Sequence, residues 1–121
     1  MKQYRSSNER EAIADWRKSL SPYRKAFLDG FLKRIANLQD WDGGLCKKIK
    51  GHPGCWELRW TAEKVEHRIF GYYDGPKVFA MLVGCTHKGK VYDPSDAFGT
   101  LKNRKAQIQK KEASLSPYEH V

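Results

Sequence analysis

Two arginines that lie among aromatic residues are the first candidates for chemistry in this sequence. Arg59 belongs to the run Trp56–Trp60, and Arg68 belongs to the run His67–Tyr73. Both runs are rich in aromatic and β-branched residues, which favours extended strands. A guanidinium is a planar fork that binds two phosphate oxygens at once and stays charged. On one face of a sheet the two arginines would form a phosphate clamp; the alternative is a solvated pair with nothing to bind.

Alternation along each strand assigns the neighbours of these arginines to two faces. Glu57 shares the face of Arg59, where it could orient the guanidinium, act as a base or form an exposed ion pair. The face of Arg68 is predicted to include Phe70 and Tyr72. The opposite face is predicted to hold Trp56, Leu58, Trp60, Ile69 and Tyr73. We therefore expect helices to cover one face, and the other to be open, with solvated arginine heads among aromatic rings.

A basic segment follows the third apolar run and adds groups that carry protons. His87 is a candidate general acid or base, because imidazole exchanges a proton near neutral pH; the alternative is an exposed loop histidine. Lys88 and Lys90 are predicted to follow a phosphate backbone. Tyr92 could donate to a phosphate oxygen, stack on a base or carry a proton. Its alternative is to pack beneath the last helix.

The charge balance points to a polyanionic partner. The chain has 23 Lys and Arg against 14 Asp and Glu, a formal net charge of +9. Such an excess favours nucleic acid over a membrane surface, although a soluble protein that is merely basic is the alternative. Lys47, Lys48 and Tyr72 complete the predicted RNA-contacting set. An aromatic content of 12% argues against disorder.

The remaining reactive side chains are expected to have simpler roles. His52 lies in a turn and His67 should point away from Arg68, so both are predicted to be structural. His120 lies near the C-terminus, in a segment with no motif. Trp41 is the tryptophan placed to touch a partner, and the others are expected in the core. Three cysteines without CxxC spacing predict small buried residues in a reducing compartment, with no metal site: Cys46, Cys55 and Cys85.

The strands that must position these residues follow from composition and turn signals. Three runs broken by Gly, Pro and Asp predict an antiparallel meander. They are Trp56–Trp60, His67–Tyr73 and Val78–Val83. Lys2–Arg5 is a possible edge strand and Leu45–Lys50 a possible further strand.

Helical spacing and capping residues predict the helices. The first is expected after a cap at Ser6, Ser7 or Asn8, and Ser21 caps a second that begins at Pro22 and ends near Leu38. The short connection between them predicts a helical hairpin. The apolar stripe of the second helix is Tyr23, Phe27, Phe31, Ile35 and Leu38. A last helix is expected from about Asp93 to Lys111, followed by a polar tail at about 112–121.

Several of these pieces together resemble one family. They are Arg10–Trp16, the Ser21-Pro22 break, Gly54–Arg59, His67–Phe70 and the Asp74-Gly75 turn before an apolar strand. In this order they resemble the RelE/ParE toxin superfamily, and most closely its phage-derived, HigB-like branch. The resemblance covers roughly residues 2–111. Its most specific parts are the Trp-Glu-Leu-Arg and Arg-Ile-Phe pieces at this separation.

The resemblance implies a fold and an activity. The fold would be α+β, with an N-terminal helical hairpin on one face of a curved, mostly antiparallel sheet of four to five strands, and a short C-terminal helix. The activity would be that of a metal-independent, ribosome-dependent messenger-RNA endonuclease without a cofactor. The implied catalytic set is Arg59, Arg68, His87 and Tyr92. Where the family often has Lys-Lys-Thr, this chain has His87-Lys88-Gly89.

The resemblance also implies partners and a location. The chain would be one toxin domain over residues 1–121, paired with a cognate antitoxin, a helix-turn-helix protein with an acidic segment to complement the toxin's charge. Messenger RNA and the ribosome would be its targets. The sequence shows no signal-peptide core and no membrane-spanning run, so we expect it in the cytoplasm. Two alternatives stay open: a ParE-like toxin of the same fold that blocks gyrase, and a non-enzymatic nucleic-acid-binding module.

Overall fold

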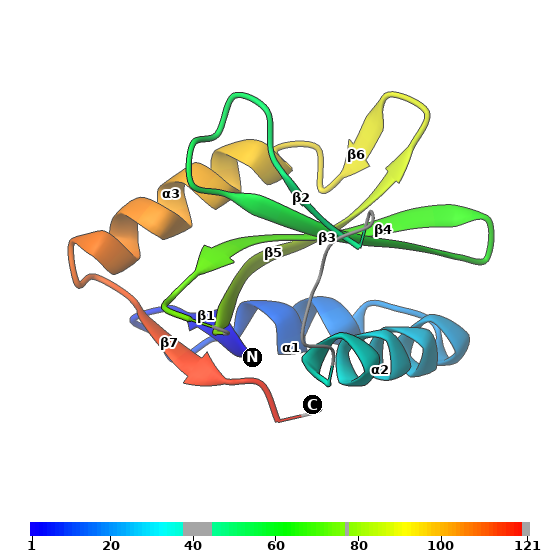
Figure 1. The fold of residues 1–121 in the computed structure, drawn as a ribbon, viewed down its shortest axis with the longest axis horizontal. Helices are drawn as coiled ribbons and strands as arrows, with labels where there is room; N and C mark the ends of the chain where they lie inside the picture. Colours follow the sequence, from blue (N-terminus) through cyan, green and yellow to red (C-terminus); the bar gives the residue numbers. More distant parts are fainter. Residues whose placement is uncertain (38–44, 77, 120–121) are drawn as a thin grey trace.

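A computed structural model describes residues 1–37, 45–76 and 78–119 of the chain. Those residues form three helices and a seven-stranded, mostly antiparallel sheet (Figure 1). The predicted class, α+β with a mostly antiparallel sheet, is confirmed. The predicted number of strands, four to five, is wrong. The predictions made for Leu38, Trp41 and His120 lie outside the described residues.

The sheet is built around the predicted meander. Its strands are β1 Lys2–Arg5, β2 Cys46–Lys48, β3 Trp56–Ala62, β4 Val65–Tyr73, β5 Phe79–Lys88, β6 Val91–Asp93 and β7 Ser114–Pro117. Their order is β2-β3-β4-β5-β1-β7, with β6 paired to the far end of β5. β1 runs parallel to β5, and the other pairs are antiparallel. All three predicted meander strands are present, and each extends beyond its predicted run.

The C-terminal segment takes part in the sheet. Strand β7 pairs with β1, so Lys2–Arg5 is an interior strand and its prediction as an edge strand is wrong. Tyr118 is buried, and its backbone N–H donates to the carbonyl of Met1 at 3.1 Å. The hydroxyl of Ser116 donates to Glu11 at 2.7 Å. Residues 114–118 are therefore held to the body of the protein by both backbone and side chains.

The helices are α1 Ala12–Lys18, α2 Pro22–Ala36 and α3 Ala97–Gln109. The Ser21 side chain accepts a hydrogen bond from the N–H of Arg24 and Pro22 is the first helical residue, which confirms that start. The predicted start of the first helix is wrong. Ser6 Oγ instead accepts from Arg10 N–H within a turn, and α1 begins only after Glu11.

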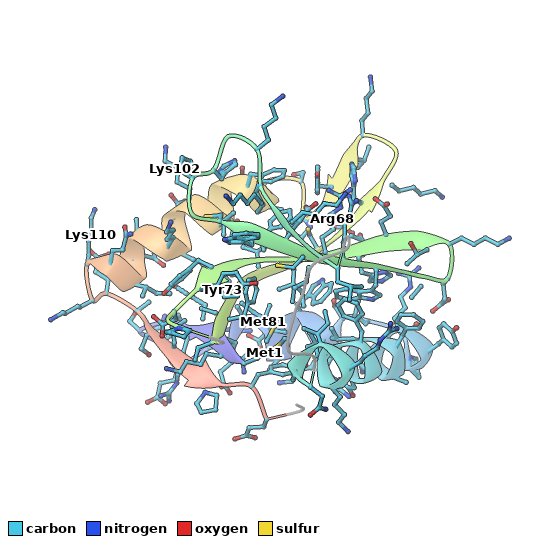
Figure 2. The ribbon with its side chains drawn as sticks, in the orientation of Figure 1. Met1, Arg68, Tyr73, Met81, Lys102 and Lys110 are labelled. Atoms are coloured by element: carbon cyan, nitrogen blue, oxygen red, sulfur yellow. The ribbon has the colours of Figure 1, made fainter. Side chains whose placement is uncertain are left out.

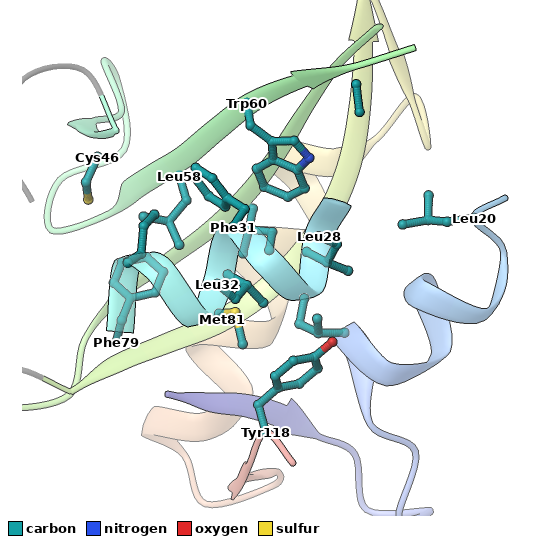
Figure 3. Packing of buried hydrophobic residues seen from close by; sticks show 14 residues of the cluster. Leu20, Leu28, Phe31, Leu32, Cys46, Leu58, Trp60, Phe79, Met81 and Tyr118 are labelled. Carbon is teal, nitrogen blue, oxygen red and sulfur yellow. The ribbon is translucent and has the colours of Figure 1, made fainter. Parts of the chain in front are cut away.

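One face of the sheet is covered by α1 and α2 (Figure 1). Leu28 and Phe31 of α2 pack with Leu58, Trp60 and their neighbours in the larger core cluster (Figure 3). The predicted stripe of α2 is partly wrong, since Tyr23 is 61% exposed and Phe27 39% exposed. The buried positions of α2 are Leu28, Phe31, Leu32 and Ile35. No helix in the described ranges is both long and apolar enough for a membrane crossing.

The opposite face is covered in part by α3. Leu101 of α3 packs with Phe70 and Leu82 in a second core cluster. The expectation of an entirely open second face is therefore wrong. A face of seven strands is too wide to be covered by one helix, and the part over the ends of β4 and β5 is lined by β6 instead (Figure 1).

A β-bulge decides which face the end of β5 presents. Phe70 pairs with Val83 while the next residue of β4 pairs with Met81, so Leu82 is an extra residue. Met81 packs in the first cluster, but Val83 packs in the second. Gly84 faces the helices, because an added Cβ would meet the Trp16 ring at 2.2 Å. The bulge thus reverses the alternation and brings the far end of β5 onto the face of Arg68.

Candidate functional site

Arg68 is the centre of a polar cluster on the face opposite α1 and α2 (Figure 2). Its Nη1 donates to Glu57 Oε2 and to the Tyr92 hydroxyl, both at 3.2 Å. Its Nη2 donates to Glu66 Oε2 at 2.9 Å. The side chain is only 12% exposed. The expectation of a solvated arginine head is wrong, because two carboxylates and a phenol surround the guanidinium.

Glu57 holds the two arginines together. Arg59 lies directly across from Arg68 in the β3–β4 register, so two positive side chains share one cross-strand pair. The Glu57 carboxylate contacts both, at 3.2 Å from Arg68 Nη1 and 3.7 Å from Arg59 Nη1. Glu57 is 8% exposed, so the alternative of an exposed ion pair is wrong. Its charge offsets a repulsion that would otherwise oppose this pairing.

His87 lies on strand β5 rather than in a loop. It pairs with Tyr92 of β6, and the two rings stack with centroids 4.0 Å apart and planes 11° apart. The His87 Nδ1 atom lies 3.5 Å from Glu66 Oε2, is buried, and makes no hydrogen bond to the described residues. The alternative of an exposed loop histidine is therefore wrong, and the bulge in β5 is the reason that His87 joins Arg68.

Tyr92 packs against the last helix, which was one of the alternatives that the sequence left open, and it also contacts Arg68. Its ring packs against Phe98 of α3, with centroids 5.1 Å apart. Its hydroxyl meanwhile accepts from Arg68, whose guanidinium also lies 5.7 Å from the ring centroid. Packing under the helix thus fixes the position of the hydroxyl in the cluster.

The cluster sets the charge states of its members. Burial alone would lower the pKa of Arg68, but its hydrogen bond to Glu66 and the charge of Glu57 raise that pKa overall. The hydrogen bond from Arg68 lowers the pKa of Glu66. Burial raises the pKa of Tyr92 and, more strongly, raises the pKa of the adjacent Cys85 thiol to about 12. At neutral pH the cluster therefore holds charged Arg68 and Glu66 beside a protonated phenol and thiol.

The predicted RNA-contacting residues are not all on this face. Lys47 pairs with Glu57 across β2 and β3, so it lies on the arginine face and is exposed. Lys48 lies on the other face, with Nζ 5.5 Å from the centre of the Trp56 ring. Lys88 is exposed and follows His87 on the strand, so alternation turns it to the opposite face.

Lys90 and Tyr72 flank the cluster at a greater distance. Lys90 is exposed in the turn between β5 and β6. Tyr72 lies farther along β4, half-buried against the second core cluster, with Lys105 Nζ 5.9 Å from its ring centroid. The structure therefore gathers Arg59, Arg68, His87 and Tyr92 closely, and leaves the predicted RNA-contacting residues around them or on the far face.

His52 and His67, the described histidines outside the cluster, both pack against aromatic rings. His67 is fully buried on the helix-covered face and stacks on Trp60, with centroids 5.6 Å apart. His52 stacks on Phe98 at 5.1 Å. The three cysteines are buried and form no disulfide. Trp16, Trp56 and Trp60 all pack in or against the first core cluster.

Sequence reasoning overlooked Glu66, which contacts both Arg68 and His87. Glu66 precedes Arg68 by two residues in a strand, so alternation alone would have placed it on the same face. The far end of β5 offered no such signal, because the extra residue of the bulge is invisible in an apolar run.

No protein-family model matches this chain, and neither a curated protein nor a solved structure is detectably similar to it. Within residues 1–37, 45–76 and 78–119, no group of three or more His, Cys, Asp or Glu side chains is arranged to hold a metal ion.

Proposed function

We propose that this protein is a toxin of the RelE/ParE superfamily, of the HigB-like branch, and cleaves messenger RNA in the ribosome without a metal ion. The proposal includes the RelE-like arrangement, in which α1 and α2 form a hairpin on the sheet of a single domain. The observation that carries it is the cluster itself. Arg59, Arg68, His87 and Tyr92 come from four strands, β3 to β6, and they meet around two carboxylates, those of Glu57 and Glu66.

RNA cleavage of this kind needs a cation at the scissile phosphate. The 2′-hydroxyl attacks the neighbouring phosphorus, and the resulting phosphorane gains negative charge on its equatorial oxygens. Arg68 is positioned for that charge, since Glu57 and Tyr92 fix its guanidinium from one side. Arg59 lies across from it as the second cation. Preorganised donors of this kind act without reorganising during the reaction.

The proton transfers are assigned to His87 and Tyr92. With Nδ1 of His87 buried beside Glu66, its Nε2 is the nitrogen that serves the substrate. We assign His87 as the base that takes the proton of the 2′-hydroxyl. Tyr92 keeps its proton because burial raises its pKa, so it is the donor toward the departing 5′-oxygen. The bond from phosphorus to the 2′-oxygen forms as the bond to the 5′-oxygen breaks.

Glu66 occupies the place of the substrate. Its carboxylate takes the Nη2 donor of Arg68 and is 47% exposed, whereas Glu57 is almost completely buried. Two carboxylate oxygens resemble two phosphate oxygens in geometry and charge. We infer that the scissile phosphate displaces Glu66 from Arg68 and leaves the Glu57 contact in place.

The proposed partners follow from the same assignment. A cognate antitoxin with an acidic segment would neutralise the toxin in the cytoplasm, since complementary charge speeds association. We therefore expect that expression of this chain alone arrests growth and that co-expression of an antitoxin encoded next to it relieves the arrest. Normal growth despite abundant soluble protein, in a host without the antitoxin, would contradict a toxin.

Primer extension on cellular messages after brief induction tests the reaction. Cuts that follow the codon phase are expected in the parent, and none with His87→Gln at equal protein level. DNA damage without message cleavage would instead identify a gyrase poison. Growth arrest with neither message cleavage nor DNA damage would favour the remaining alternative, a nucleic-acid-binding module that does not cut.

A further inference from the structure

A second basic region lies on the same side of the sheet as the Arg68 cluster. A hollow of about 400 Å³ opens between the turn at residues 51–55 and helix α3. Its lining includes His52, Cys55, Lys102, Lys105 and Gln109, and we call it the α3 hollow. Lys102 and Arg68 both project on the α3 side of the sheet (Figure 2).

The two segments that line the α3 hollow carry positive charge and no carboxylate of their own. Neither residues 45–56 nor residues 97–111 contain an Asp or Glu, and together they contain eight Lys or Arg. Lys102 is exposed. Lys105 Nζ donates to the Pro53 carbonyl at 3.3 Å and to Cys55 Sγ at 3.9 Å, which fixes its position and leaves one further donor on the same nitrogen. Unlike the Arg68 cluster, this region therefore attracts an anion without first giving up an internal partner.

A continuous row of rings joins the α3 hollow to the cluster. His87 stacks on Tyr92, Tyr92 packs edge-on against Phe98 at 5.1 Å, and Phe98 stacks on His52 at 5.1 Å. All four side chains are half-buried, so each retains an exposed part. The row begins at His87 and Tyr92, the proposed base and acid, and ends at His52 in the lining of the hollow. Phe98 is itself stacked between His52 and Phe70, at 5.1 and 4.7 Å, so the rings left to stack on bases are those at the two ends of the row, His52 and the His87–Tyr92 pair.

We propose that the α3 hollow is a second phosphate subsite for single-stranded RNA, reached along this ring row from Arg68. Rings for bases beside lysines for phosphates are the combination that binds single strands. An acidic protein segment would use the lysines but would have no need of the rings. That the bound strand is the cleaved message rests on the proposed function, whereas the subsite itself does not.

The test is binding of a fluorescein-labelled 12-nucleotide RNA with 2′-O-methyl groups, followed by anisotropy between 50 and 200 mM salt. The methyl groups block the attacking hydroxyl, so binding is measured without cleavage. Lys102→Glu should weaken binding by about tenfold and reduce the slope of log affinity against log salt by about 0.7 or more. A two-nucleotide RNA should lose this sensitivity, because its single internal phosphate cannot occupy both the Arg68 site and the α3 hollow.

Lys33→Glu is the matched control. Lys33 is exposed on α2, across the sheet, and its reversal changes the net charge equally. The proposal requires that Lys33→Glu bind the 12-nucleotide RNA within about twofold of the parent. Equal losses in both variants would mean general charge attraction only and overturn the subsite, as would a parent that binds no RNA.

Two further readings separate the subsite from its alternatives and from the nuclease proposal. In the first, Lys102→Glu weakens binding of an acidic peptide but leaves RNA binding unchanged. That result would assign the hollow to a protein partner and overturn our proposal. In the second, Lys102→Glu loses RNA binding, but the parent protein does not cleave unmodified RNA on ribosomes. That result would support the subsite and overturn the nuclease proposal.

Discussion

Each face of the central strands holds one histidine against an aromatic ring, and the surroundings of the two differ in kind. His67, on the face covered by α1 and α2, is fully buried and stacks on Trp60 at 5.6 Å. His87, on the face partly covered by α3, stacks on Tyr92 at 4.0 Å and has a carboxylate 3.5 Å away. Burial lowers the pKa of His67, so the imidazole there is held neutral.

The difference shows how the molecule divides packing from chemistry. On the helix-covered face the histidine lies fully buried among apolar and aromatic side chains and serves as a flat, polar core residue. The Arg68 face takes charge but compensates it internally, with Glu57 and Glu66 against Arg59 and Arg68. The uncompensated lysines lie farther out, beside α3. A polyanion would thus be attracted first by the peripheral lysines, and only at the centre would it have to displace a carboxylate from an arginine.

The largest expected effect is that of Arg68→Ala. Cleavage should fall by about 10²–10³, because a preorganised donor to the phosphorane is lost. The free energy of unfolding should fall by about 3 kcal/mol, since Glu57 is left buried without its closest cation. Urea unfolding followed by circular dichroism, with cleavage assays on the same preparation, measures both. This differs from the expectation that alternation gives, in which a solvated arginine contributes little to stability.

A double variant separates these two losses. Arg68→Ala with Glu57→Gln should recover much of the stability, because the orphaned charge is gone, but none of the cleavage. Arg68→Lys should restore cleavage only in part, since an ammonium keeps the charge and loses the fork. Full cleavage by a folded Arg68→Ala protein would rule out the clamp. Unchanged stability would show that Glu57 does not depend on Arg68.

The next effect is that of His87→Gln, which should lower cleavage by about 100-fold and weaken binding of the 2′-O-methyl RNA far less, since one ring is lost and the phosphate contacts remain. Tyr92→Phe should cost less stability than Arg68→Ala, since it retains the ring contacts and loses one hydrogen bond, worth about 1 kcal/mol. If His87→Gln cleaves at the parental rate, the proton transfer passes to Tyr92. Lys88 is a poorer substitute, because it faces away from the cluster.

Local sequence patterns predicted the strands and the faces near Arg68 well. Alternation in Trp56–Trp60 and His67–Tyr73 works because both strands are regular and each carries one polar side. The same logic fails for β5, where the bulge at Leu82 reverses the faces. His87 was therefore chosen for its chemistry and its basic neighbours, and its place beside Arg68 depends on an insertion that the sequence does not mark.

Long-range pairing was the other limit of sequence reasoning. Strand β7, Ser114–Pro117, has too little apolar character to predict a strand, and only its pairing with β1 makes it one. The exposure of Tyr23 and Phe27 has a related cause. Helical spacing gives a stripe of the right period, but which of two adjacent apolar rows meets the sheet depends on tertiary packing. The burial of Arg68 likewise required β6 and α3, which are distant in sequence.

A smaller effect tests the helix-covered face through pH. Unfolded His67 binds a proton below about pH 6.5, whereas folded His67 resists it because burial lowers its pKa. The unfolded state therefore binds more protons, and stability should fall as pH drops below about 6.5, by at most about 1.4 kcal/mol per pH unit. Its charged neighbours act in opposite directions, since Arg24 lowers the pKa of His67 and Glu63 raises it.

Urea unfolding between pH 5 and 7.5 measures this slope. His67→Asn keeps a donor for the Val65 carbonyl, which the ring Nδ1 contacts at 3.0 Å, and should flatten the slope. An unchanged slope in His67→Asn would mean that His67 is not the group that titrates.

The smallest expected effect concerns Glu66, the exposed partner of Arg68. Glu66→Gln retains an oxygen for Arg68 Nη2 but removes the negative charge that a phosphate must displace. The 2′-O-methyl RNA should therefore bind a few times more tightly, while stability changes by less than about 1 kcal/mol, as is usual for an ion pair with one exposed member. Glu63→Gln is the matched control. Glu63 lies in the turn between β3 and β4, is similarly exposed, and forms an ion pair with Arg24 of α2. An equal gain in both variants would attribute the effect to net charge and remove Glu66 from the phosphate position. Weaker binding in Glu66→Gln alone would show that the carboxylate orders Arg68 for the substrate and does not compete with it.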